Sequence, residues 1–201
     1  MIAKTSAGRY LSGMISILSQ PGIQKRALPL SVKAWHQMIA AGLAPRHAEL
    51  IRGVIVEKMS KSITHTKLAG RILAAFQRCL GSGFWIRKED PLSLADSEPE
   101  PDVSVIEGNE EDFTDHPGSA KLVVEVAVTT VAEDREMAVL YAEASVEEFW
   151  LVNAPERCVE VFRDPQDGRY LSSLRVAEGS MLRSSALPGV EVDVGTLFAQ
   201  I

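Results

Sequence analysis

The chain has no long hydrophobic run and very little cysteine, and both absences restrict its class. None of its apolar stretches approaches the roughly 20 residues that a transmembrane helix needs, and residues 1–29 lack the apolar core and cleavage site of a secretory signal. We therefore expect a cytoplasmic protein with no membrane partner. The two cysteines, Cys79 and Cys158, lie within apolar patterns, which is typical of buried thiols in a reducing compartment rather than of a disulfide.

The chain also lacks an excess of positive charge. Lysine and arginine total 21 against 27 aspartates and glutamates, which gives a net charge of -6. A typical DNA-binding module carries a basic surface, so this composition argues mildly against nucleic acid as a partner. It does not exclude a nuclease whose carboxylates bind a divalent cation, because such a site is acidic until the metal arrives.

Several familiar catalytic motifs are missing. The sequence has no paired cysteines and histidines at zinc spacing, no glycine-rich phosphate loop and no Gly-x-Ser-x-Gly elbow. His36, His47 and His116 lack ligand spacing with one another, so we interpret them as surface or loop residues. Any chemistry must come from other residues.

The length and composition indicate one domain. With 201 residues and 46% hydrophobic content, the chain can bury one substantial core. Residues 1–29 show weak periodicity and are assigned to an N-terminal extension, and residues 30–201 to the domain.

Three amphipathic helices are predicted from apolar residues that recur every three or four positions. They cover residues 31–43, 62–80 and 132–144, and Ser31 is the expected N-cap of the first. Their predicted buried faces consist of Val32, Trp35, Met38, Ile39 and Leu43; Leu68, Ile72, Leu73, Phe76 and Leu80; and Met137, Leu140, Tyr141 and Ala144.

Short apolar or alternating runs predict the strands. Residues 48–57 indicate a hairpin that turns near Gly53, with Leu50, Val54 and Val56 on its buried face. The run KLVVEVAVTT is typical of a central strand buried on both faces. Further strands are expected at FWIRKED, PDVSVI, EEFWLVN, CVEVFRD, RYLSSLRV and VEVDV. The element order predicts an α/β (α+β) fold with a mixed sheet flanked by helices and extra antiparallel strands at the C-terminus.

Three carboxylates stand where a buried sheet would normally exclude charge. Glu49 opens the first hairpin, Asp102 follows a proline at the start of a strand, and Glu125 lies inside LVVEV. Burying an ionised Glu125 would cost several kcal/mol unless a cation or hydrogen-bond donor compensates it. A hard divalent cation such as Mg²⁺ could do so. An edge position, or an ion pair with Lys121 or Arg135, is the alternative.

The order of several segments resembles a known family. ELIRG, SEPEPDVSVI, LVVEVAVTT, EDRE and LYAEASVEEFWLVN, with His65 at the start of a long helix, are similar to the Uma-type family of restriction-endonuclease-like proteins over about residues 30–197. That family belongs to the PD-(D/E)XK nuclease superfamily. The resemblance implies a restriction endonuclease-like fold, Mg²⁺- or Mn²⁺-dependent hydrolysis of DNA, and a homodimer. It assigns the metal-binding and catalytic positions to Glu49, Asp102 and Glu125.

The chain departs from this pattern at one position. The family carries a lysine one helical turn before a tyrosine, and here the tyrosine is Tyr141 while the lysine position holds Met137. Loss of one such preorganised donor typically costs about 10²- to 10³-fold in rate. Lys88, on the strand before Asp102, could supply a substitute ammonium and is included among the catalytic candidates; an ordinary solvated lysine is the alternative reading.

Three functions follow as hypotheses. The first is a DNA endonuclease. The second is a catalytically impaired relative that acts as a binding or dimeric interaction module, because the family lysine is replaced. The third is a self-associating structural protein with Phe149 and Trp150 on its dimer face. His65 matches a family histidine and could either approach the acidic site or make only a cap contact at its helix.

Overall fold

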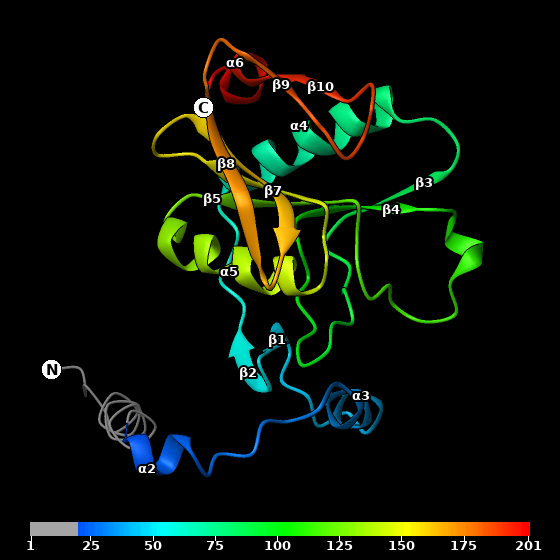
Figure 1. The fold of residues 1–201 in the computed structure, drawn as a ribbon, viewed down its shortest axis with the longest axis vertical. Coiled ribbons are helices and arrows are strands. Elements are labelled where there is room, and N and C mark those ends of the chain that lie inside the picture. The colour runs from blue at the N-terminus through cyan, green and yellow to red at the C-terminus, as the bar shows by residue number, and fades with distance from the viewer. Residues whose placement is uncertain (1–19) are drawn as a thin grey trace, which may run out of the picture.

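The computed structural model describes residues 20–201 (Figure 1), so most of the predicted N-terminal extension lies outside the described residues. The described part of the extension contains one short helix, α2 (Pro21–Gln24), with no buried residue. None of the helices within residues 20–201 combines the length and apolar character that crossing a membrane would require.

A six-stranded mixed sheet forms the centre of the domain. Its strand order is β3-β4-β5-β6-β7-β8. Only β5 and β6 run parallel, and every other neighbouring pair is antiparallel. The strands are β3 (Phe84–Arg87), β4 (Val103–Glu107), β5 (Leu122–Ala127), β6 (Glu148–Asn153), β7 (Cys158–Gln166) and β8 (Arg169–Ala177). The predicted mixed sheet and its antiparallel C-terminal strands are confirmed, and β5 is a central strand.

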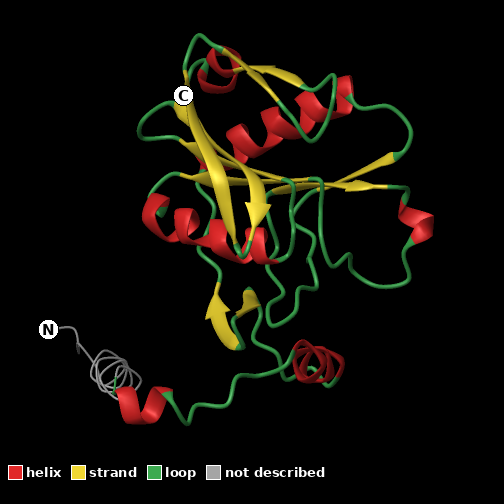
Figure 2. Cartoon of the chain, viewed as in Figure 1, coloured by secondary structure: helices red, strands yellow, loops and turns green. Residues whose placement is uncertain are grey.

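Helices cover the two faces of this sheet (Figure 2). On one face α4 (Ile63–Cys79) packs with α6 (Val194–Phe198) and the small hairpin β9 (Met181–Arg183) and β10 (Glu191–Asp193). On the other face α5 (Val131–Glu143) packs against β5 to β8. Leu68, Ile72 and Phe76 of α4 are fully buried, as their spacing predicts. β9 and α6 are additional to the predicted elements.

A second, two-stranded sheet lies beyond the main one, below α5 in the view of Figure 1. It consists of β1 (Ala48–Ile51) and β2 (Val54–Glu57), next to the loop that follows α3 (Val32–Ala40). Positive φ angles at Arg52 and Gly53 form the tight turn between the strands. Leu50 is buried as predicted, but Val54 and Val56 are exposed. This hairpin is separate from the central sheet, so its predicted buried face was wrong for β2.

Other expectations about burial need similar correction. In α3, which Ser31 caps as predicted, Trp35 is buried but Ile39 is exposed. Leu43, predicted for the same helix, lies beyond its end at Ala40 and is exposed. Both cysteines are free thiols, and Cys79 is exposed rather than buried. Phe149 and Trp150 are fully buried. They pack in the clusters on opposite faces of the sheet and cannot form a dimer face.

Candidate active site

The register of β4 and β5 brings two of the predicted carboxylates together. Val103 lies opposite Val124, so Asp102, just before β4, comes next to Glu125. The backbone N–H of Asp102 donates to Glu125 Oε2 at 3.3 Å, and that of Val126 donates to Asp102 Oδ2 at 2.9 Å. The sheet therefore fixes both carboxylates through main-chain amides.

Glu125 has a partner from the helix on the same face. The hydroxyl of Tyr141 on α5 donates to Glu125 Oε1 at 2.6 Å. Burial and then the negative charge of Asp102 raise the pKa of Glu125 well above its ordinary value, and the Tyr141 hydrogen bond only partly offsets them. The charges of Asp134 and Glu49 raise this pKa further. Glu125 thus lies in a strongly negative environment.

The alternative partners proposed for Glu125 are engaged elsewhere. Lys121 pairs with Glu107 and Glu147, and Arg135 pairs with Glu160. Within residues 20–201, Glu125 has no salt bridge. Its burial is therefore not explained by an ion pair.

Asp102 contacts two basic side chains. Lys61 Nζ lies 2.9 Å from Oδ1, and His65 Nε2 lies 2.9 Å from Oδ2. Burial by itself would raise the pKa of Asp102, but the hydrogen bonds and positive charges of His65 and Lys61 outweigh it and lower the pKa. His65 also donates its backbone N–H to Ser62 Oγ at the start of α4. Both contacts that we considered for this histidine are present.

Glu49 lies alongside this pair without touching it. Its Oε2 accepts the backbone N–H of Glu100 at 3.2 Å, and burial, the largest effect, raises its pKa. Residues 20–201 contain no group of three or more His, Cys, Asp or Glu side chains already arranged to hold a metal ion. Of the three predicted ligands, Asp102 and Glu125 are in contact through the backbone, and Glu49 acts on Glu125 through its charge.

Two further residues belong to this site and were not identified from the sequence. Asp134, in the first turn of α5, accepts a hydrogen bond from Thr130 Oγ1 at 2.6 Å, and burial followed by the charge of Asp102 raises its pKa. Acidic residues are common in the first turn of any helix, so its position gave no distinguishing signal. Lys61 lies in a polar loop with no local pattern.

Neither Lys88 nor Met137, the two positions considered for the ammonium, forms a salt bridge with Glu49, Asp102 or Glu125 among the described residues. Lys88 Nζ lies 3.2 Å from Glu89 Oε1, and Lys61 Nζ lies 3.2 Å from the same oxygen. Lys88 is therefore linked to Asp102 only indirectly, through Glu89 and Lys61. Met137 is partly buried against the hydrophobic cluster around α5.

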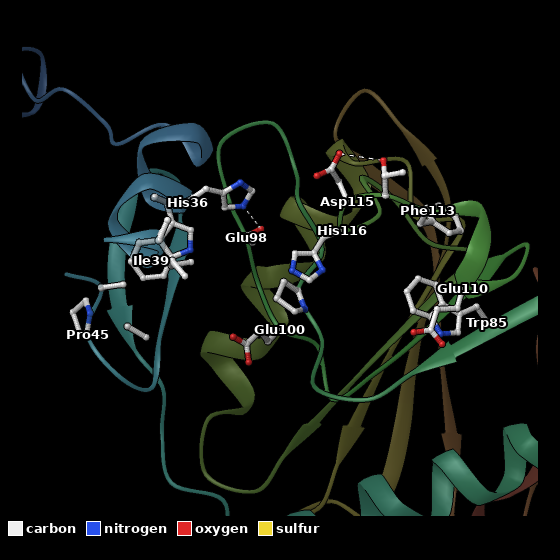
Figure 3. Close-up of a pocket in the computed structure, with 16 residues that line it drawn as sticks. His36, Ile39, Pro45, Trp85, Glu98, Glu100, Glu110, Phe113, Asp115 and His116 are labelled. Atoms are coloured by element: carbon white, nitrogen blue, oxygen red, sulfur yellow. Dashed lines mark hydrogen bonds and ion pairs between the residues drawn. The ribbon is translucent and has the colours of Figure 1, made fainter. Parts of the chain in front are cut away.

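An open cleft of about 730 Å³ lies beside α3, and none of Glu49, Asp102 and Glu125 lines it (Figure 3). α3 lines one side, the segment 110–116 and Trp85 line the other, and Glu98 and Glu100 lie between them. His36 Nε2 lies 2.6 Å from Glu98 Oε1 within it. The backbone of Glu100 binds Glu49, so the cleft and the candidate site share this segment.

Comparison with known proteins agrees with this architecture. The family model described as "Uma2: Putative restriction endonuclease" matches residues 36–195. The chain belongs to this family. A crystal structure of a protein from Anabaena variabilis ATCC 29413, described as a putative nuclease belonging to DUF820, has the same fold with a TM-score of 0.71. The two chains are 14% identical, and the match covers 85% of this chain and 98% of the other. No curated protein matches the chain.

Proposed function

We propose that this protein is a metal-dependent DNA endonuclease whose carboxylates Glu49, Asp102 and Glu125 bind Mg²⁺ or Mn²⁺. The observation that carries the proposal is the contact between Asp102, just before β4, and Glu125 on β5, with no cationic side chain paired to Glu125 among the described residues. Membership of a family described as a restriction endonuclease supports the choice of DNA as substrate.

The chemistry of the donor set suits a hard divalent cation. All the predicted ligands are carboxylate oxygens, which Mg²⁺ and Mn²⁺ prefer. The charge of Asp134 adds to theirs, since it raises the pKa of both Glu125 and Glu49. When bound, the cation would lower the pKa of a coordinated water and stabilise charge on the phosphate. Glu49 must turn towards the pair for all three to share one ion.

The chain's own residues prepare this site. Tyr141 orients Glu125 through its hydroxyl, and the amide of Val126 orients Asp102. Each carboxylate oxygen can accept more than one contact, so these hydrogen bonds leave capacity for a ligand. Lys88 remains a predicted source of the ammonium that the family places at position 137.

Cleavage of plasmid DNA in Mg²⁺ or Mn²⁺ tests the proposal. We expect nicking or linearisation by the natural protein and loss of it in Asp102→Ala at matched thermal stability. The proposal fails if no form of DNA is cleaved and the melting temperatures of both proteins are equally indifferent to the metal.

One observation favours a second function, a binding or interaction module without catalysis. Met137 occupies the lysine position of the family. It carries no charge and packs against apolar neighbours. Calorimetric titration with Mn²⁺ separates the two functions. Saturable binding that depends on Asp102 supports the nuclease, whereas absence of such binding favours the interaction module.

The homodimer is also a proposal. β8 is an edge strand of the central sheet, and its Leu171 and Leu174 are exposed. Edge strands with exposed apolar residues are ready sites for pairing with a second copy. This edge replaces Phe149 and Trp150 as the proposed dimer face.

A further inference from the structure

Lys61 contacts one of the carboxylates of the candidate site. Its Nζ lies 2.9 Å from Asp102 Oδ1. Among residues 20–201, no other lysine forms a salt bridge with Glu49, Asp102 or Glu125. The family position for the ammonium holds Met137 instead, so the site has an ammonium that reaches it from a different segment.

Two carboxylates fix the Lys61 ammonium. Besides Asp102, it contacts Glu89 Oε1 at 3.2 Å. Lys61 also directly precedes Ser62, whose hydroxyl caps α4, so the backbone beside it is anchored to a helix start. An ammonium has three N–H donors, and these contacts use two of them. The side chain is 29% exposed, so the third donor can reach a molecule from solvent.

We propose that Lys61 supplies the ammonium that assists phosphodiester hydrolysis, in place of the missing lysine at position 137. Its free N–H would donate to a phosphate oxygen or to the attacking water beside Asp102. The group therefore comes from the loop before α4 rather than from α5. This inference rests on the proposed nuclease function.

Lys88 is the competing source, and its contacts are less suited to the role. It reaches Glu89 but none of the three predicted ligands among the described residues. Lys61 and Lys88 contact the same oxygen of Glu89. Lys88 can therefore help to keep Glu89 ionised while Lys61 contacts Asp102. Lys88 would then act on the site only through Glu89.

Relocating the ammonium provides the sharpest test. The set comprises the natural protein, Lys61→Met, Met137→Lys, the double variant Lys61→Met with Met137→Lys, and Lys88→Met. Lys67→Met is the matched control, because Lys67 is exposed on α4 and has no salt bridge to the residues that the structure describes. Each variant is compared for melting temperature, plasmid cleavage rate in Mn²⁺, Mn²⁺ affinity, and DNA affinity in Ca²⁺ at several salt concentrations.

We expect Lys61→Met to lose about 10²- to 10³-fold in cleavage rate, as for removal of a preorganised donor, with Mn²⁺ affinity equal or tighter. The slope of log affinity for duplex DNA against log salt should fall by about 0.9, as for one lost phosphate contact. Adding Met137→Lys to Lys61→Met should restore cleavage. The Lys67→Met protein should match the natural one.

Three results would overturn the inference. The first is Lys61→Met cleaving within about threefold of the natural rate. The second is a loss of cleavage that follows a loss of Mn²⁺ affinity or stability. The third is an inactive natural protein that Met137→Lys activates, which shows a competent carboxylate site without a substitute ammonium. Failure of the nuclease function itself differs from all three, because then no variant cleaves DNA and none binds Mn²⁺ through Asp102.

Discussion

Tyr141 donates its hydroxyl to Glu125 Oε1 at 2.6 Å and so joins α5 to the carboxylate pair of the central sheet. This hydrogen bond lowers the pKa of Glu125 against the opposing effects of burial and of Asp102. In Tyr141→Phe that pKa should rise further. The Glu125 carboxyl then loses its proton only at a higher pH, and a cation can bind only after that loss. We expect the pH of half-maximal Mn²⁺ binding to move upward, measured by calorimetry over a pH series. An unchanged pH profile at unchanged stability would contradict the role given to Tyr141.

Glu125 should reduce the stability of the protein at neutral pH. Its folded-state pKa is raised, so between the ordinary value near 4.5 and that raised value the folded state binds more protons than the unfolded state. Stability therefore falls as pH rises through the folded pKa, and the ionised form is the unfavourable one. Glu125→Gln should melt higher at neutral pH, by about 2–4 °C for each kcal/mol relieved.

The same substitution has a built-in pH control. The gap in melting temperature between Glu125→Gln and the natural protein should close as pH falls towards 4.5, because both then carry a neutral group. Thermal denaturation at several pH values measures this gap. A Glu125→Gln protein that melts lower than the natural one at neutral pH would show that the carboxylate is not strained.

Glu148 is a buried carboxylate with the opposite behaviour. Burial would raise its pKa, but hydrogen bonds from Ser184, Trp150, the Ala186 amide and Arg163 outweigh it and lower the pKa. Its contribution to stability is thus present above the ordinary pKa of 4.5 and is lost as pH falls through the lowered folded value. Glu148→Ala should destabilise the fold by about 3–5 kcal/mol, since it leaves buried partners unpaired.

Glu147 is the matched control for that measurement. It is the neighbouring residue, its side chain is about half exposed, and it pairs with Lys121 at the surface. Glu147→Ala should change the free energy of unfolding by less than about 1 kcal/mol. Urea denaturation above and below pH 4.5 compares the two variants. Equal effects, or a Glu148→Ala loss that grows on acidification, would contradict the account of Glu148.

The edge of β8 gives a prediction about assembly. Leu174 is 38% exposed on a strand that pairs only with β7 within the described chain. If two copies join at this edge, Leu174→Lys should convert a dimer to a monomer and leave Mn²⁺ binding unchanged. Light scattering after size exclusion measures the mass. A natural protein that is monomeric, or a dimer that persists in the variant, would reject this interface.

Strongly periodic segments were predictable from the sequence, and segments without a packing partner were not. β5 is largely buried and α4 buries one face, so their apolar spacing gave both the elements and the inward faces. In β2, Val54 and Val56 point to the same face of the strand, yet both are exposed because the hairpin stands apart from the central sheet. Only the three-dimensional arrangement determines what lies opposite such a face.

The candidate site divides in the same way. Glu49, Asp102 and Glu125 were identifiable because a charge within a predicted buried strand is costly, and the family resemblance then assigned all three as metal ligands. Lys61 and Asp134 carry no such signal, since a charged residue in a loop or a first helical turn is ordinary. Lys61 joins the site through its contact with Asp102, 41 residues away in the sequence. Asp134 joins it through the effect of its charge on Glu125 and Glu49. No local pattern encodes either relationship.

A crystal grown or soaked in Mn²⁺ and measured for anomalous scattering tests the metal site most directly. The expected result is one strong peak bound by oxygens of Asp102 and Glu125, with Glu49 turned to join them and Asp134 close by. The same peak should be missing from Asp102→Asn crystals treated identically. A peak elsewhere in the natural protein, or none while Lys61 and His65 keep their contacts with Asp102, would contradict the assignment of these carboxylates as metal ligands.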